Sequence, residues 1–278
     1  MPLYATNAVS SVDAHQEGQN IVITYQLSEQ SDVTVSVSTN GGATYSSIKS
    51  VMGDVGASVS AGSKSVVWNV LADYEKFCFE NVCFKVEGYS GFVDLGLSVK
   101  WATCNVGANA PEEYGDYFAW GETKPKDFYE WSTYKWCNGS RYKLTKYCRS
   151  SRAGRVDNKT VLDLVDDAAH VNLGGASRMP TLGELRELKD NCTWTWTKVN
   201  GVKGCTVTGP NGNSIFLPAA GYRDGSDLYN AGSEGNYWGR SLDIDGSYDA
   251  CHLYFDSDNV DWNGIDLYYG QSVRPVLP

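Results

Sequence analysis

The sequence has little positive charge and no long apolar run. It contains 23 Lys and Arg against 33 Asp and Glu, and its formal net charge is −10. Because nucleic acids and anionic membranes are bound through basic surfaces, this balance argues against both as the main partner. No segment reaches the roughly 18 apolar residues of a membrane span, so no membrane insertion by this chain is expected.

The cysteine pattern and the start of the chain exclude further classes. The eight cysteines are spread along the sequence without a Cys-x-x-Cys pair, so neither a disulfide-dense scaffold nor a zinc ribbon is expected. Cys78 and Cys83 flank a candidate two-residue turn, which leaves open a cross-strand disulfide or two free thiols. The first basic residue is Lys49, so no signal peptide is expected within this sequence.

Residues 1–90 have the pattern of an all-β unit. Apolar or alternating runs at 21–27, 33–38, 65–70 and 82–86 are separated by turn signals such as Asn40-Gly41, and no helical period appears. Short strands at this spacing predict a β-sandwich. The segment resembles the immunoglobulin-like modules that precede other domains in bacterial surface proteins.

Residues 91–278 have a different texture, dense in Trp, Tyr and Gly. The clearest helix is expected over 181–191, where Thr181 and Glu184 have the capping-box spacing. A second short helix is expected over 161–169. Strands are expected at 193–199 and 205–208, on either side of an Asn-Gly turn. The second unit is therefore predicted to be α+β with little helix.

Four motifs in this second unit carry a specific resemblance. They are VDLGLSVKWA at 93–102, YGDYFAWGE at 114–122, RMPT at 178–181 and YGQSVRPV at 269–276. In this order they resemble the Fibrobacter succinogenes major paralogous domain, found in Bacteroidetes and Fibrobacter. The resemblance implies a C-type lectin-like fold related to the formylglycine-generating enzyme domain, so the chain is expected to join an immunoglobulin-like sandwich to a C-type lectin-like domain.

The resemblance does not carry the enzyme's activity, because a formylglycine-type oxidase needs paired cysteines near its C-terminus. Only Cys251 lies in the last 70 residues. The three histidines are far apart and no Gly-x-Ser-x-Gly elbow occurs, so no catalytic residues are assigned. The chain is expected not to be an enzyme.

A calcium site is an alternative that the aspartates keep open. Segments 243–249 and 256–261 are rich in the oxygen ligands that calcium prefers. They do not match the EF-hand spacing, and the nearest match to a lectin's Trp-Asn-Asp triplet is Trp262-Asn263-Gly264, which lacks the acid. No metal or cofactor is therefore assigned, and solvated turn aspartates are the simpler explanation.

The tail at 223–269 has a composition suited to variation. It contains no Lys, Gln or Met and a single Glu, between frame aromatics such as Trp238 and Trp262. Some C-type lectin-like proteins are targets of diversity-generating retroelements, whose adenine mutagenesis of Asn codons does not produce Lys, Glu, Gln, Met or Trp. The alternative is a fixed loop domain with an ordinary Asp- and Asn-rich composition.

These patterns predict a non-catalytic recognition or adhesion protein, extracellular or on the surface of a cell or phage virion, with a protein or cell-surface ligand. A fixed glycan- or calcium-binding protein and a structural surface or fimbrial module are the alternatives. Ligand contacts are expected at Asp227, Glu234, Asn236, Gly239, Arg240, Asp243, Asp245, Asp249, His252, Asp261, Asn263, Ile265 and Asp266.

Overall fold

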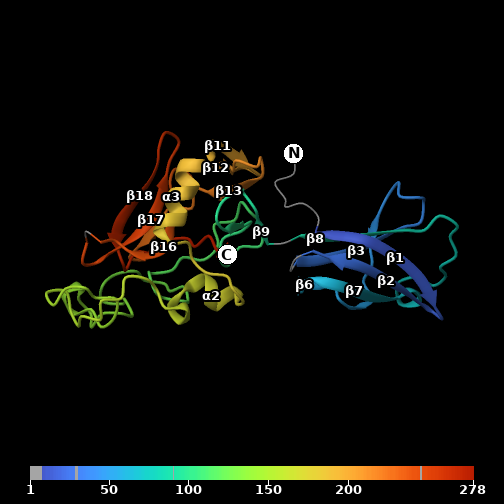
Figure 1. The fold of residues 1–278 in the computed structure, drawn as a ribbon, viewed down its shortest axis with the longest axis horizontal. Helices are drawn as coiled ribbons and strands as arrows, with labels where there is room; N and C mark the ends of the chain where they lie inside the picture. Colours follow the sequence, from blue (N-terminus) through green and yellow to red (C-terminus); the bar gives the residue numbers. More distant parts are fainter. Residues whose placement is uncertain (1–7, 29–30, 90, 245) are drawn as a thin grey trace. The chain divides into compact units, whose positions relative to one another are not determined.

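The computed structural model describes residues 8–28, 31–89, 91–244 and 246–278. The chain is mostly β-sheet with little helix, which confirms the β-rich prediction. It divides into two compact units, Tyr4–Gly91 and Phe92–Pro278 (Figure 1). These are called the sandwich unit and the C-terminal unit below. Within the described ranges, no helix is long and apolar enough to span a membrane.

The described residues of the sandwich unit form two antiparallel sheets around one apolar core. The first sheet has the order β1 (Val9–Glu17), β2 (Asn20–Leu27), β7 (Gly62–Asn69), β5 (Val51–Gly53). The second has β4 (Ser46–Ser47), β3 (Ser31–Ser38), β6 (Gly56–Val59), with β8 (Cys83–Tyr89) also paired to β3. Alternate residues of β2, β3 and β7 are buried, as the period-2 patterns predicted.

Trp68 is the centre of this core. It is fully buried, and the rings of Tyr74, Phe77 and Phe84 pack against it edge-on at 5.2–6.1 Å. Its indole Nε1 donates a 2.9 Å hydrogen bond to Asp73, in the short helix α1 (Val70–Asp73). The buried indole is therefore both packed and hydrogen-bonded, as large aromatic residues in cores usually are.

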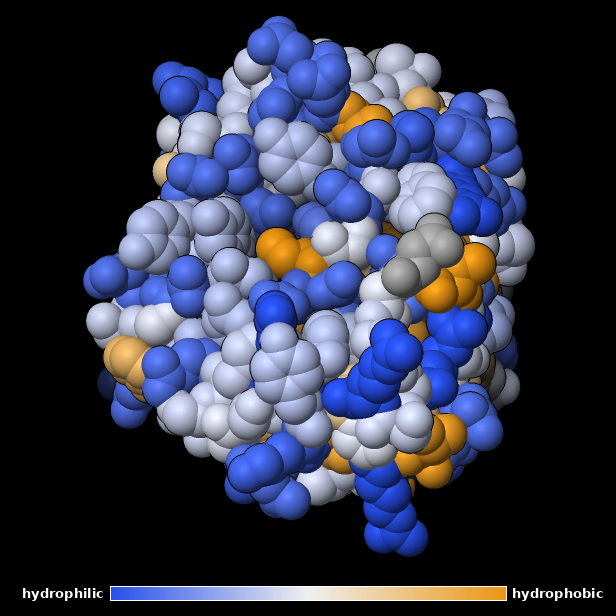
Figure 2. Space-filling view, turned by 90° about the vertical axis from the view of Figure 1, so that its left-hand side faces the viewer, coloured by the Kyte–Doolittle hydropathy of each residue, from blue (hydrophilic) through white to orange (hydrophobic). Residues whose placement is uncertain are grey.

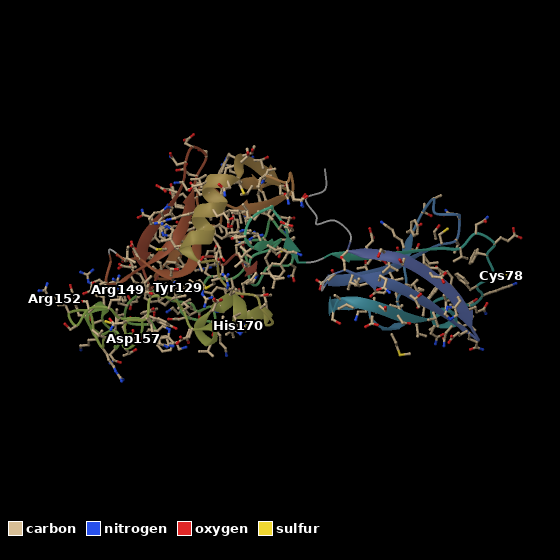
Figure 3. All side chains as sticks on the ribbon, in the orientation of Figure 1. Cys78, Tyr129, Arg149, Arg152, Asp157 and His170 are labelled. Carbon is tan, nitrogen blue, oxygen red and sulfur yellow. The ribbon has the colours of Figure 1, made fainter. Side chains whose placement is uncertain are left out.

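The hairpin expected between Cys78 and Cys83 does not form. β8 begins at Cys83, residues 77–79 belong to no strand, and both cysteines are free thiols. The physical reason is that Phe77 packs on Trp68, so this segment follows the core instead of pairing with β8. Cys78 consequently lies exposed on a loop of the sandwich unit (Figure 3).

In the described part of the C-terminal unit, which leaves out residue 245, there are four small antiparallel sheets and two short helices. The sheets are β9 (Phe92–Val93), β10 (Lys100–Ala102) and β19 (Val276–Leu277); β11 (Thr193–Val199), β12 (Val202–Thr208) and β13 (Ser214–Pro218); β14 (Tyr222–Asp224) and β15 (Asp227–Tyr229); and β16 (Gly235–Leu242), β17 (Asp249–Phe255) and β18 (Val260–Asp266). The helices are α2 (Ala168–Leu173) and α3 (Leu182–Asn191), with 3-10 turns η1 (Arg141–Lys143) and η2 (Leu164–Asp166).

Helix α3 begins where the sequence predicted. The Thr181 hydroxyl accepts from the Glu184 backbone N–H and the Glu184 carboxylate accepts from Thr181, which completes a capping box. Glu184 also receives two hydrogen bonds from the Arg178 guanidinium at 2.6–2.7 Å. Through Leu185 and Leu188, both fully buried, the helix packs across the sheet of β16, β17 and β18 (Figure 1).

The helix expected over 161–169 is wrong in position. The observed helix, α2, starts at Ala168, because the Asp167 side chain accepts from the His170 backbone N–H and caps it there. Leu162 instead donates its backbone N–H to Arg240, which holds this segment in extended form beside β16.

The first and last strands of the C-terminal unit close it. β10 pairs with β9 on one side and with β19 on the other. Beneath them the Arg274 guanidinium is 1% exposed and donates to Asn105 Oδ1, the Ala102 carbonyl and the Phe216 carbonyl at 2.8–3.0 Å. One side chain therefore ties three distant segments together, and its burial lowers the pKa of Arg274.

Candidate functional site

A line of seven partly exposed aromatic rings runs over the surface of the C-terminal unit. Consecutive ring centroids are 4.4–6.2 Å apart. In spatial order the rings belong to Tyr229, Tyr222, Tyr269, Tyr268, Trp131, Tyr248 and Tyr142. We call this set the aromatic line. None of its members is buried, and the two end rings, Tyr142 and Tyr229, are 57% and 43% exposed.

Backbone hydrogen bonds assemble the aromatic line from distant segments. Tyr222 and Tyr229 are opposite each other in the β14–β15 hairpin. Arg223 and Gly270 exchange both backbone hydrogen bonds at 2.7 and 3.0 Å, which sets β14 beside the segment carrying Tyr268 and Tyr269. Tyr129 and Gly225 do the same at 2.8 Å, and this contact places the loop that carries Trp131.

Two carboxylates lie against this line at the end of the β17–β18 ladder. Asp249 and Asp266 are directly opposite each other in the register and share a side-chain hydrogen bond. Burial, followed by the charge of Asp249, raises the pKa of Asp266 to about 6. Burial also raises the pKa of Asp249, and Asp243 adds to that effect. Two adjacent carboxylates resist double ionisation, so the pair holds a proton in mildly acidic solution.

Arg141 is a cation whose charge acts on this pair. Its guanidinium lies 5.1 Å from the ring of Tyr142 and 5.3 Å from that of Tyr248, in the geometry of a cation–π contact. It also opposes the raised pKa values of Asp249 and Asp266 by its charge. The surface thus combines aromatic rings, a protonatable acid pair and one exposed guanidinium.

The side of the molecule on which Arg149 and Arg152 lie has a mostly polar surface. Figure 2 views the molecule from the side on which Arg149 and Arg152 lie in Figure 3, and its apolar areas are small and separate. Tyrosine rings carry a hydroxyl group, so tyrosines with polar neighbours can supply contact area without forming a contiguous apolar patch. Such a face does not carry the large contiguous apolar patch by which many interaction sites are recognised.

Several of the residues predicted from the sequence do lie at this face or beside it. Asp249 and Asp266 form the acid pair, and Asp243 acts on it electrostatically. Asp227 is exposed on β15, and Glu234 is partly exposed and acts electrostatically on Tyr222. Asp245 lies outside the described residues.

Four other predicted contacts lie on β16 and β18, outside the aromatic line itself. Asp261 is exposed but pairs with Lys189 of α3 at 3.0 Å. Asn263 is exposed on β18, and Ile265 packs partly buried against the core. Arg240 donates a 2.6 Å hydrogen bond to the Leu162 carbonyl, so it fastens the 160s loop to β16.

The prediction of direct ligand contact is wrong for three buried residues. His252 is 4% exposed, and its Nδ1 is 3.1 Å from the Asn263 carbonyl; burial lowers the pKa of His252 to about 4. Asn236 is 3% exposed on β16. Gly239 lies under α3, where an added Cβ would be 2.9 Å from a Leu185 methyl group. All three serve the packing of the sheet.

Sequence reasoning missed most of the aromatic line. Tyr268 and Tyr269 lie in the 223–269 tail but are not among the ligand contacts expected from the sequence, and Trp131, Tyr142 and Tyr222 lie outside the tail. The signal that could have found them is the density of aromatic residues between 128 and 147. Trp238, by contrast, is fully buried, as expected for a frame residue.

Metal binding and the reactivity of the Cys251 thiol depend on how side chains are arranged in the part of the chain that the structure describes. No group of three or more His, Cys, Asp or Glu is arranged there to hold a metal ion. Burial raises the pKa of the Cys251 thiol to about 11, so this sulfur is protonated at neutral pH and is a poor nucleophile.

No family model, curated protein or solved structure matches the chain. Function is therefore inferred from the geometry of this unit.

Proposed function

We propose that the chain is a non-catalytic recognition or adhesion protein whose C-terminal unit binds its ligand through the aromatic line. The observation that carries this proposal is the continuity of seven partly exposed rings. Tyr and Trp supply large, rigid contact area at low cost in conformational entropy. The two end rings, Tyr142 and Tyr229, are the most accessible of the set, whereas the five rings between them are only partly exposed.

A protein or other cell-surface molecule is the ligand class that this surface fits best. Tyrosine-rich, partly polar surfaces are typical of protein-binding paratopes. The nearby carboxylates of Asp224, Asp249 and Asp266 disfavour a nucleic acid. In this proposal the chain acts outside or on the surface of a cell or virion, with the sandwich unit as an immunoglobulin-like stalk and the C-terminal unit as a C-type lectin-like head.

Diversification of this face by a retroelement is part of the proposal. Asp227, Asp243, Asp249 and Asp266 lie at or beside the aromatic line, whereas Trp238 is buried and would preserve the fold. Deep sequencing of the gene from a natural population tests this. Substitutions should cluster at adenine-bearing codons of 223–269, and sparse, uniform substitution would leave a fixed binder.

Three exposed tyrosines provide a matched binding test. Tyr142 and Tyr229 end the aromatic line, and Tyr45 of the sandwich unit is similarly exposed at 42%. Y142A and Y229A together should weaken binding to whole bacterial cells by about tenfold or more, with thermal stability unchanged. Y45A should bind normally. Equal loss in Y45A, or none in the double variant, would refute the proposal.

Protease treatment of the cells separates the ligand classes. Loss of binding after treatment indicates a protein ligand. Retention, together with signal on a glycan array, would replace it by the glycan alternative.

A further inference from the structure

A polar cavity lies beside β14. It has a volume of about 360 Å³, within the range of small-molecule sites. Its walls include Asp116, Tyr117, Lys126, Asp127, Tyr129 and Arg223. Arg223 and its neighbour Tyr222 are consecutive in a strand and so point to opposite faces, which separates this cavity from the aromatic line.

Arg223 brings an incompletely paired guanidinium to this cavity. The group lies 5.2 Å from the Tyr117 ring, and its Nη1 donates a hydrogen bond to the Ser226 carbonyl at 3.3 Å. Among the described residues no carboxylate lies within 4 Å of it. Since a guanidinium has five N–H donors in a fork that matches a carboxylate, donors remain for a ligand anion.

Asp116 brings a carboxylate to the same cavity from a fixed position. Its backbone N–H donates to the Val106 carbonyl at 2.9 Å, and its carboxylate lies against Gly107, where an added Cβ would be 2.5 Å from Oδ2. Asp127 adds a second, exposed carboxylate. In the described part of the chain neither carboxylate is paired with a cation.

Lys126 does not neutralise these groups. Its ammonium donates to Glu122 Oε1 at 2.9 Å and to the Thr133 carbonyl at 3.1 Å, so its charge is matched by Glu122. The cavity therefore presents opposite charges that are unpaired with each other, with the rings of Tyr117 and Tyr129 as walls.

We propose that this cavity binds a small zwitterion of the amino acid class, with its carboxylate on Arg223 and its ammonium on Asp116 and Asp127. A molecule with only one of the two charges would leave the other protein group without a partner, so the zwitterion should bind more tightly than either half. This inference is independent of the recognition function proposed above.

Calorimetric titration of the full chain with matched probes tests the proposal. The zwitterions glycine, β-alanine and γ-aminobutyrate are compared with butyrate and butylamine, which carry one charge each. At least one zwitterion should bind at least tenfold more tightly than both single-charge probes. R223Q and D116N should each weaken that binding by about tenfold or more, the effect of losing one charge-assisted contact.

Two further variants serve as controls for general effects of charge removal and for loss of folding. R152Q removes an exposed guanidinium that lies well away from the cavity wall at Tyr129 (Figure 3) and should bind as wild type. If D116N alters the circular dichroism spectrum, D127N, at an exposed position, replaces it. Absence of binding by every zwitterion, equal binding of butyrate, or normal binding by R223Q would each overturn the proposal.

Discussion

Replacing Asp266 by Asn should stabilise the C-terminal unit at neutral pH and leave its stability unchanged in acid. Burial and Asp249 raise the pKa of Asp266 from 3.8 to about 6, so ionising this group costs folding free energy. Below about pH 4 the carboxyl is protonated in both states and costs nothing; as pH rises through 6 the folded state loses a proton that the unfolded state lost earlier. The stability that the protonated Asp266 carboxyl contributes is therefore lost as the pH rises from about 4 to about 6.

The magnitude follows from the size of the pKa change. A difference of about two pKa units corresponds to about 3 kcal/mol. Asp266 is only partly buried, and solvent screens its interaction with Asp249, so about 1–2 kcal/mol is the expected gain for D266N at pH 7.5. The Asn side chain retains hydrogen-bonding capacity toward Asp249 while removing the like charge.

Urea unfolding followed by tryptophan fluorescence measures this difference at about pH 4 and pH 7.5. Asp261 on the same strand gives a control of opposite sign, because its hydrogen bond from Lys189 lowers its pKa. D261N should therefore lose a little stability at pH 7.5, below about 1 kcal/mol for an exposed pair. A D266N variant that is less stable than wild type at pH 7.5 would contradict this reasoning. So would an equal gain in stability at both pH values, because ionisation of Asp266 would then not be what costs folding free energy.

Three further outcomes are expected. Thr181→Ala should lower unfolding free energy in urea by about 1 kcal/mol by removing the N-cap of α3; an unchanged midpoint would contradict this. Gly235→Ala should lower the free energy of unfolding by about 1–3 kcal/mol or more, because its Cβ would be 2.1 Å from the Phe255 ring. Gly201→Ala should lower it by about 1 kcal/mol, because this position has open space but a positive φ. Iodoacetamide on the native protein should label Cys78 and spare Cys251, read by mass spectrometry; rapid labelling of both would mean that β17 opens.

Local features were predictable from the sequence because their determinants are close together in the chain. The N-terminus of α3 depends on Thr181 and Glu184, three residues apart. The β11–β12 hairpin depends on Asn200 and Gly201, which adopt φ values of 49° and 87°. Both positive values are those that a tight two-residue hairpin turn requires and that Asn-Gly supplies.

The candidate site was less predictable, because its parts meet only through long-range contacts. The aromatic line depends on the pairing of Arg223 with Gly270 and of Tyr129 with Gly225, and no local pattern reveals either. His252 shows the converse problem. The composition of the tail around His252 suited a variable ligand contact. The strand register instead places His252 opposite Trp238 in the β16–β17 ladder, where its side chain is buried. Burial is a property of the assembled sheet.

The pairing of β10 with β19 has a consequence for how the protein is made. Trp101 pairs with Val276, and the Arg274 guanidinium reaches Asn105 and Ala102. A nascent chain emerging from the ribosome must therefore hold the 92–105 segment open until residues 274–277 have been synthesised, about 170 residues later. The sandwich unit has no such dependence. It can reach its native state during translation, whereas the unit that carries the aromatic line cannot complete the β9–β10–β19 sheet until residues 276–277 have been synthesised.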